Sequence, residues 1–287
     1  DNFIDKAFTS AEKEAINQVT VVNNDNPEYG TEGGNDTKDK VFLLSIEEVL
    51  NPDYGFSSVS YEYDNARWRT NTAYAKEQGA WTYNTTDEDY VKYNGNGYWW
   101  LRSPGDSTDS AACVGSDGYV YTFSYGVDYI NIAVCPALHL NLSSNLWSYA
   151  GIVCTDGTVD ESGTSKPVAP VTPATLSNPR KDSDGNVTYD CVWFGRYPQS
   201  DATGEKKDAI KWRVLSVDGN DAFLIADCNL DCQKYNTTWR SVTWETSTIR
   251  SWLNGYNASY NANGIDYSSD NFIDKAFTSA EKEAINQ

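Results

Sequence analysis

The sequence predicts an α+β fold in which strands lie at both ends of the domain and helices lie between them. Residues 210–216 alternate, with every second side chain apolar, and an Asp-Gly turn connects them to the apolar run 222–226, which is the pattern of a β-hairpin. Apolar residues within 249–253 follow helical spacing. The stretch 97–142 is rich in aromatic and β-branched segments separated by Asn-Gly and Asp-Gly turns, which favours strands.

Two capping boxes mark further helix starts. Thr9 with Glu12, and Ser45 with Glu48, place a hydroxyl and a carboxylate three residues apart, the spacing that satisfies free N–H groups in a first helical turn. Between them the apolar run 41–44 predicts a buried strand. We therefore expect helices after Thr9 and after Ser45, separated by that strand.

The chain contains one long exact repeat. Residues 1–18, DNFIDKAFTSAEKEAINQ, recur letter for letter as residues 270–287. A long exact period is typical of an array of domains, so we interpret the chain as a window that opens in the middle of one domain of a tandem array. An engineered permutation or a local duplication is the alternative. On the window interpretation, the two copies should share one local fold.

A segment rich in Pro, Ser and Thr, 161–179, separates two parts of the chain. Such segments favour extended, semi-rigid spacers. The predicted organisation is the back half of one domain in 1–149, a linker in 150–189, and the front half of the next copy in 190–287. Because the linker tends to hold the halves apart, we expect material outside this chain to complete the front half, residues 192–287; a fold-back of residues 1–149 across the linker is the alternative.

The composition argues against several classes of partner. The chain has 41 acidic and 22 basic residues and a net charge of −19, whereas nucleic acids and anionic membranes need a basic surface. No apolar run approaches the length of a membrane span. With no CxxC pair and a single His, the six cysteines predict disulfides in an oxidising, extracellular or cell-surface location, and a zinc site built from cysteines alone is the alternative. The cysteines are Cys113, Cys135, Cys154, Cys191, Cys228 and Cys232.

Six segments resemble an uncharacterised family of bacterial surface domains. They are IKWRVL (210–215), TWETSTIRSWLNG (243–255), FTSAEKEAI (8–16), KVFLLSIEEV (40–49), YWWLRSPG (98–105) and VCPALHLNL (134–142). The family is a repeat domain of large secreted proteins of Gram-positive gut bacteria. The resemblance implies a C-type-lectin-like fold and no established activity. Formylglycine-generating enzymes and hypervariable retroelement receptors share that fold, so the fold alone selects no function.

The chain departs from this family at two cysteines. Cys135 stands where the family usually has Arg, and Cys113 where it usually has an aromatic residue. Gaining both together implies a disulfide between them, on neighbouring strands. By the same reasoning the other pairs are Cys154 with Cys191, which bracket the linker, and Cys228 with Cys232, which lie four positions apart.

The sequence offers no catalytic or metal-binding constellation. His139 lies between two leucines without an adjacent nucleophile or base partner, so we expect a structural or surface role and no cofactor. Arg102, next to a tryptophan pair, is either half of a buried ion pair, which is favoured, or a ligand-binding cation. Asp182 and Asp184 precede a glycine that comes too early for a calcium loop, which favours a plain turn.

A Tyr-rich stretch is the best candidate for a binding surface. Strand alternation places Tyr119, Tyr121 and Phe123 on one face, and Tyr offers contact area and a hydroxyl at low entropic cost. Such a face could bind a ligand or contact another copy of the chain. The candidate residues are Tyr119, Tyr121, Phe123, Tyr125, Asp128, Tyr129 and Asn131.

Taken with the repeat, these features predict a structural repeat unit of an extracellular fibre, stalk or surface array, whose partners are neighbouring copies of itself. The alternative is an adhesin that recognises a glycan or a host protein through the Tyr-rich face. Enzyme activity, nucleic-acid binding and a membrane span are not expected.

Overall fold

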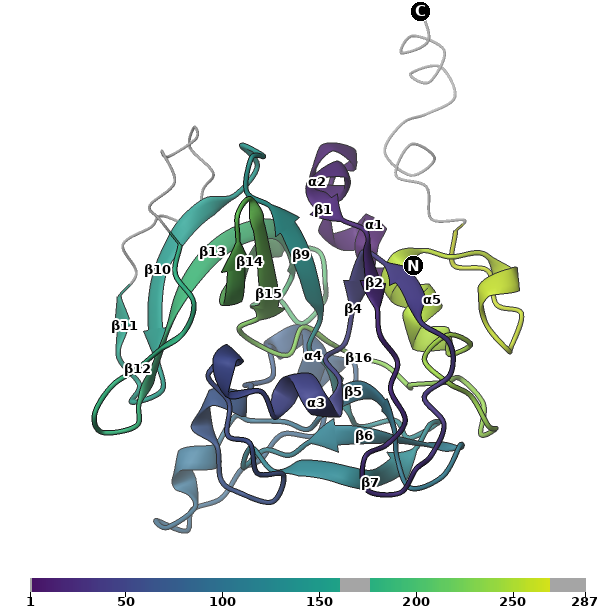
Figure 1. Ribbon diagram of the computed structural model, residues 1–287, viewed down its shortest axis with the longest axis horizontal. Coiled ribbons are helices and arrows are strands. Elements are labelled where there is room, and N and C mark those ends of the chain that lie inside the picture. Colours follow the sequence, from purple (N-terminus) through teal and green to yellow (C-terminus); the bar gives the residue numbers. More distant parts are fainter. Residues whose placement is uncertain (1, 161–175, 269–287) are drawn as a thin grey trace, which may run out of the picture.

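The computed structural model describes residues 2–160 and 176–268, which form mainly β-structure (Figure 1). Strands take up 33% of the described residues and helices 15%, so the prediction of an α+β fold of the C-type-lectin type is wrong. The capping boxes at Thr9 and Ser45 are both present and do start helices. These helices extend for only one or two turns, because a capping box fixes where a helix begins and not its length. The core is built by sheets instead.

The helices are short and lie around the sheets (Figure 1). The α-helices are α1 (Phe3–Ala7), α2 (Ser10–Ala15), α3 (Ile46–Val49), α4 (Ala73–Glu77) and α5 (Thr248–Asn254). Single 3₁₀ turns occupy Pro52–Tyr54, Asn65–Arg67, Val91–Tyr93 and Ala258–Tyr260.

Within the described residues, the larger sheet has nine strands in the order β1-β9-β15-β14-β13-β10-β11, with β4 also paired to β9 and β12 to β13. Its strands are β1 (Ile16–Asn17), β4 (Val41–Phe42), β9 (Ala137–Asn141), β10 (Ser148–Cys154), β11 (Val159–Asp160), β12 (Arg180–Lys181), β13 (Val187–Pro198), β14 (Lys207–Asp218) and β15 (Asp221–Ala226). The predicted hairpin is confirmed: β14 and β15 pair through Asp218 and Asp221, and Gly219 supplies the positive φ of the tight turn between them.

The smaller sheet has the strand order β16-β8-β5-β6-β7 and lies below the larger one in the view of Figure 1. Its strands are β5 (Trp99–Pro104), β6 (Ser110–Val114), β7 (Val120–Gly126), β8 (Ala133–Val134) and β16 (Asp231–Cys232); a separate pair consists of β2 (Val19–Val21) and β3 (Thr37–Asp39). One continuous apolar core joins the elements, and Trp99, Trp100, Trp212 and Trp244 are almost completely buried in it.

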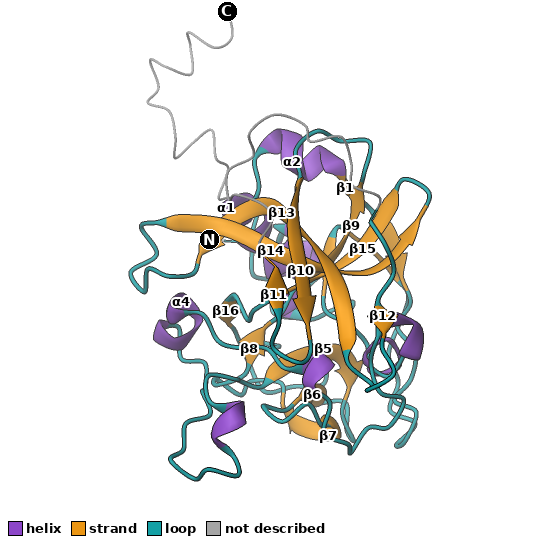
Figure 2. Ribbon diagram, turned by 90° about the vertical axis from the view of Figure 1, so that its left-hand side faces the viewer, coloured by secondary structure: helices purple, strands orange, loops and turns teal. Residues whose placement is uncertain are grey.

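The two parts of the chain close on each other. β9, from the first part, is hydrogen-bonded to β15 from the second, with Leu138 opposite Leu224. The expectation that outside material completes residues 192–287 is therefore wrong for the described residues. The premise that the linker holds the halves apart fails, because strands on either side of the Pro-rich segment lie in one sheet: β10 and β12 both pair with β13 (Figure 2). Residues 161–175, and the second copy of the repeat at 270–287, lie outside the described residues.

Candidate functional site

A continuous group of aromatic side chains lies at the surface around β7, and we call it the aromatic band. Neighbouring rings have centroids 4.7–6.4 Å apart, the range in which aromatic side chains attract one another. Several of the rings are exposed to solvent; the exposed fraction is 43% for Phe123, 44% for Tyr129 and 42% for Trp81. The members are Tyr61, Tyr63, Trp81, Tyr98, Tyr119, Tyr121, Phe123, Tyr125 and Tyr129.

The conformation of β7 presents its part of the band to solvent. Val120 and Thr122 are buried, whereas Tyr121 and Phe123 lie at the surface, as alternation along a strand requires. The register with β6 then shifts at Ser124, whose φ of +32° is unusual for a residue other than glycine. Such an irregularity changes the direction in which the following side chains point. Tyr125 accordingly stacks on Tyr129, with ring centroids 4.7 Å apart.

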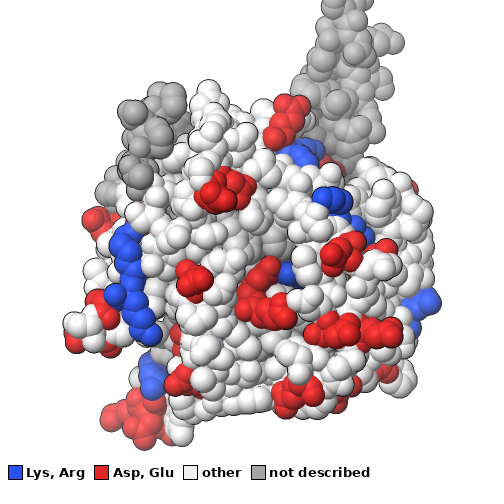
Figure 3. All heavy atoms as spheres, viewed as in Figure 1, with Lys and Arg blue, Asp and Glu red and all other residues white. Residues whose placement is uncertain are grey.

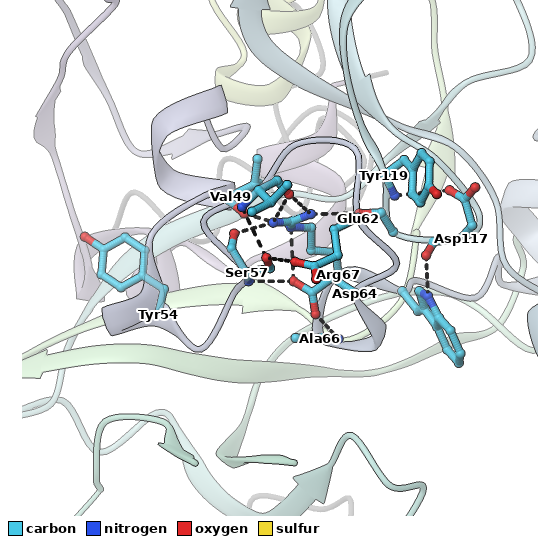
Figure 4. Close-up of polar contacts among 12 residues, drawn as sticks. Val49, Tyr54, Ser57, Glu62, Asp64, Ala66, Arg67, Asp117 and Tyr119 are labelled. Carbon is cyan, nitrogen blue, oxygen red and sulfur yellow. Dashed lines mark hydrogen bonds and ion pairs between the residues drawn. The ribbon is translucent and has the colours of Figure 1, made fainter. Parts of the chain in front are cut away.

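A buried arginine holds the loop that supplies Tyr61 and Tyr63 (Figure 4). The Arg67 side chain is fully buried, and its guanidinium donates hydrogen bonds to the carbonyls of Val49 (2.9 Å) and Gly118 (2.9 Å). It also pairs with the carboxylate of Asp64 at 3.1 Å. Burial lowers the pKa of Arg67, and the Asp64 charge opposes that shift.

This anchoring brings two distant parts of the chain together at the surface. Gly118 belongs to the turn between β6 and β7, so the contact with Arg67 fixes residues 57–67 against that turn. The ring of Tyr63 then lies 4.8 Å from that of Tyr119, and Tyr61 lies edge-on to Tyr121. The band is therefore assembled from a loop and a strand that sequence alternation alone does not connect.

A hollow of about 320 Å³ opens at one end of the band. The rings of Trp81 and Tyr98 are stacked, with centroids 5.2 Å apart and planes 15° from parallel. The stacked Tyr125 and Tyr129 form another part of the lining, and Asn131 adds an amide. The backbone N–H of Trp81 donates to the carbonyl of Asn131 at 3.0 Å, which fixes the two segments that frame the hollow.

The phenols of Tyr98 and Tyr121 stay neutral at physiological pH. Burial, with Tyr125 and Asp117 nearby, raises the pKa of Tyr98 to about 12. Burial and the same aspartate raise the pKa of Tyr121 as well. Neutral phenols can both donate and accept hydrogen bonds, so the band combines apolar faces with uncharged polar edges.

All the candidate residues predicted from the sequence lie on or beside this band. Tyr119, Tyr121, Phe123, Tyr125 and Tyr129 are members of it, Asn131 lines the hollow, and Asp128 is half-buried on the loop between them. Whether this face binds a ligand or contacts another copy stays a prediction. Sequence reasoning missed Tyr61, Tyr63, Trp81 and Tyr98. The cluster of tyrosines at 61–63 was the available signal.

The polar residues considered from the sequence have structural partners. The Arg102 guanidinium forms two hydrogen bonds with the carboxylate of Glu48, at 2.5 and 2.9 Å, and is 4% exposed, which confirms the favoured ion-pair role. His139 stacks on Phe223, and its Nδ1 lies 2.6 Å from a carboxylate oxygen of Asp221. Burial opposes ionisation of Asp221, yet the contact with His139 and a hydrogen bond from Asn17 lower its pKa.

The predicted disulfides are not formed, because all six cysteines are free. Strand β5 lies between the strand of Cys113 and β8, which immediately precedes Cys135. Two strand spacings of about 4.8 Å each exceed the reach of a disulfide, about 7 Å between Cα atoms. In the β10–β13 pair, Cys154 is opposite Thr188 and Cys191 is opposite Gly151, which leaves those cysteines three positions out of register.

The predicted disulfide between Cys228 and Cys232 is not formed either. The thiol of Cys228 contacts the Thr70 hydroxyl at 3.4 Å, whereas the thiol of Cys232 donates to the carbonyls of Ile130 and Ile132. Because the thiols are free, the cysteines do not support the predicted location in an oxidising compartment.

The described parts of the chain contain neither the pattern of a metal-ligand cluster nor that of a membrane-spanning helix. No group of three or more His, Cys, Asp or Glu side chains there is placed to hold a metal ion. The carboxylate of Asp182 instead accepts hydrogen bonds from the backbone N–H groups of Asp184 and Asn186, as in a plain turn. No helix in residues 2–160 and 176–268 is long and apolar enough to cross a bilayer. Asp and Glu side chains are scattered over the face shown in Figure 3.

Comparison with known proteins gives a match over part of the chain. Residues 1–142 match the profile of a domain of unknown function, DUF6273. No curated protein and no solved structure matches the sequence. The match covers strands and loops that build the whole aromatic band, so the band lies within the region that resembles this domain.

Proposed function

We propose that this chain is a binding module of the cell exterior that recognises neutral glycans through the aromatic band. The observation that carries the proposal is the hollow lined by two stacked aromatic pairs, Trp81 with Tyr98 and Tyr125 with Tyr129. The C–H faces of a sugar ring are apolar and pack against aromatic rings, while its hydroxyls need hydrogen-bonding groups at the rim. Phenols and the amide of Asn131 supply such groups.

The charge of the chain limits which glycans it is expected to bind. A net charge of −19 repels uronic-acid and sulfated polymers, and the described residues that line the hollow include no Lys or Arg to hold them. Uncharged oligosaccharides are therefore the favoured ligands. The location outside the cell is part of the proposal and is supported by the acidic, Tyr-rich composition.

The test is titration calorimetry with neutral gluco-, manno-, xylo- and chito-oligosaccharides. Trp81→Ala and Tyr129→Ala should each weaken binding at least about tenfold, because each removes one partner of a stacked pair. Trp239→Ala is the matched control, since Trp239 is 70% exposed and lies outside the band. The proposal fails if the unaltered chain binds none of these sugars, or if all three variants weaken binding equally. Binding of a protein through the band would also replace the glycan proposal.

A second function is carried by a different observation, the exact duplication of residues 1–18. We propose as a second candidate that the chain is a repeating unit of a surface assembly whose partners are other copies of itself. Light scattering and electron microscopy of the purified chain at rising concentration test this directly. Elongated particles are expected, and a monomer at all concentrations would contradict it.

A further inference from the structure

The described part of the first repeat copy, residues 2–18, lies in a groove formed by later parts of the chain. At its beginning, the side-chain amide of Asn2 donates to the carbonyl of Tyr267 at 2.7 Å. Phe3 is fully buried, and its ring lies 4.9 Å from that of Tyr197 and 5.7 Å from that of Trp252. Figure 1 shows the N-terminus and α1 beside α5.

The middle of the segment packs against β13 and β14 of the larger sheet. The ring of Phe8 packs on Phe194 and Trp212, with centroids 5.2 and 6.3 Å away. At Gly195, whose φ is +69°, an added Cβ would lie 2.3 Å from the Phe8 ring. Glycine at this position therefore leaves the space that the ring occupies. The Lys6 ammonium donates to the hydroxyl of Tyr74 at 2.6 Å.

The end of the segment forms the edge strand of the sheet. In β1, Ile16 is opposite Leu140 and Asn17 is opposite His139. The Asn17 amide donates to the carboxylate of Asp221 at 2.6 Å. The groove thus recognises this sequence by apolar side chains, by hydrogen bonds and by strand pairing, all of them contributed by residues outside the segment.

Residues 270–287 have the same sequence as residues 1–18, so they carry every side chain that the groove contacts. The connection from the described residues to this second copy is also short. Tyr267 already touches Asn2, and only three residues separate Tyr267 from Asn271, which is the equivalent of Asn2 in the second copy. The first copy is tethered at its other end, where Gln18 precedes β2.

We propose that residues 270–287 of the same chain bind this groove in exchange with residues 1–18. One groove then serves two identical segments, and whichever copy is displaced becomes available for contacts elsewhere. The inference rests on the repeat and on the contacts of the first copy, and it does not depend on glycan binding.

The test compares three variants of the full chain by urea unfolding. Phe3→Ala with Phe8→Ala disables the first copy, Phe272→Ala with Phe277→Ala disables the second, and the third variant carries all four changes. If the copies exchange, each two-site variant should change the folding equilibrium by only about twofold, because the intact copy replaces the altered one. In the four-site variant the folding equilibrium constant should fall at least about a hundredfold, because buried rings are deleted from both copies.

Hydrogen exchange with mass spectrometry reports which copy is bound, since their flanking residues distinguish the peptides. Protection should move from residues 1–18 to 270–287 in the Phe3→Ala, Phe8→Ala variant, in a particle of monomer mass. The proposal is overturned if that variant is as unstable as the four-site variant or fails to fold, or if 270–287 gains no protection. Protection that appears only in a dimer would also overturn it, because the bound copy would then come from another chain.

Discussion

The buried guanidinium of Arg67 provides a direct test of how the loop bearing Tyr61 and Tyr63 is held. Replacing it with Met keeps a long side chain in the core but removes every donor. The carbonyls of Val49 and Gly118, each 2.9 Å away, and those of Ser57 and Val59 then lose a hydrogen bond.

The cost follows from the two acceptors whose hydrogen bonds are buried, the carbonyls of Val49 and Gly118, because those of Ser57 and Val59 are only partly buried and can accept from water. Leaving a buried acceptor unsatisfied costs about 1.5 kcal/mol, so two give a loss of about 3 kcal/mol in the free energy of unfolding. Breaking the ion pair adds little further cost, because the Asp64 carboxylate keeps hydrogen bonds from the backbone N–H groups of Ser57 and Ala66, at 2.8 and 2.9 Å. The expected total for Arg67→Met is therefore about 3 kcal/mol, at the low end for a broken buried pair.

Urea unfolding followed by tryptophan fluorescence measures this loss. Arg180→Met is the control, since Arg180 also pairs with an aspartate but is 47% exposed, and an exposed pair contributes about 0–1 kcal/mol. The reasoning is refuted if Arg67→Met costs no more than Arg180→Met. The same variant should weaken any ligand contact made by Tyr61 and Tyr63.

Three further predictions concern glycines, a thiol and acid stability. Gly195→Ala should destabilise the chain by about 2 kcal/mol more than Gly219→Ala in urea unfolding, because both have positive φ but only Gly195 faces a ring, that of Phe8; equal losses would contradict this. Burial raises the pKa of the Cys113 thiol to about 12, so it should resist Ellman's reagent at pH 8 until the chain unfolds, and rapid labelling of the native chain would be the opposite result. Hydrogen bonds from the hydroxyl and the backbone N–H of Ser200 lower the pKa of Asp208 to about 2. Its contribution to stability is therefore complete above its unfolded pKa near 4 and disappears as the pH falls towards 2, and Asp208→Asn should flatten the acid unfolding curve there; an unchanged curve would count against it.

Local features of the fold are predictable from the sequence. The β14–β15 hairpin follows from alternation and a two-residue turn, and both capping boxes form as expected. These signals depend on neighbours in sequence, so short-range physics decides them.

Long-range features are not predictable in this way. The proposed Cys154–Cys191 bond depends on the register of β10 against β13, which no local pattern specifies, and that register keeps the two residues apart. The aromatic band shows the same limit. Tyr121 and Phe123 follow from alternation along β7, whereas Trp81 and Tyr61 reach the band through loops positioned by distant contacts.

The strand order of the larger sheet also determines when this chain can fold. β9 pairs with β1 and β4 on one side and with β15 on the other, and β15 ends only at Ala226. Closing such long loops costs entropy before the contacts repay it, which slows folding relative to a chain of local hairpins. During synthesis, more than eighty residues must be added after β9 before its partner β15 is complete. Until then its unpaired edge is open to pairing with other chains, a stage at which a chaperone would be most useful.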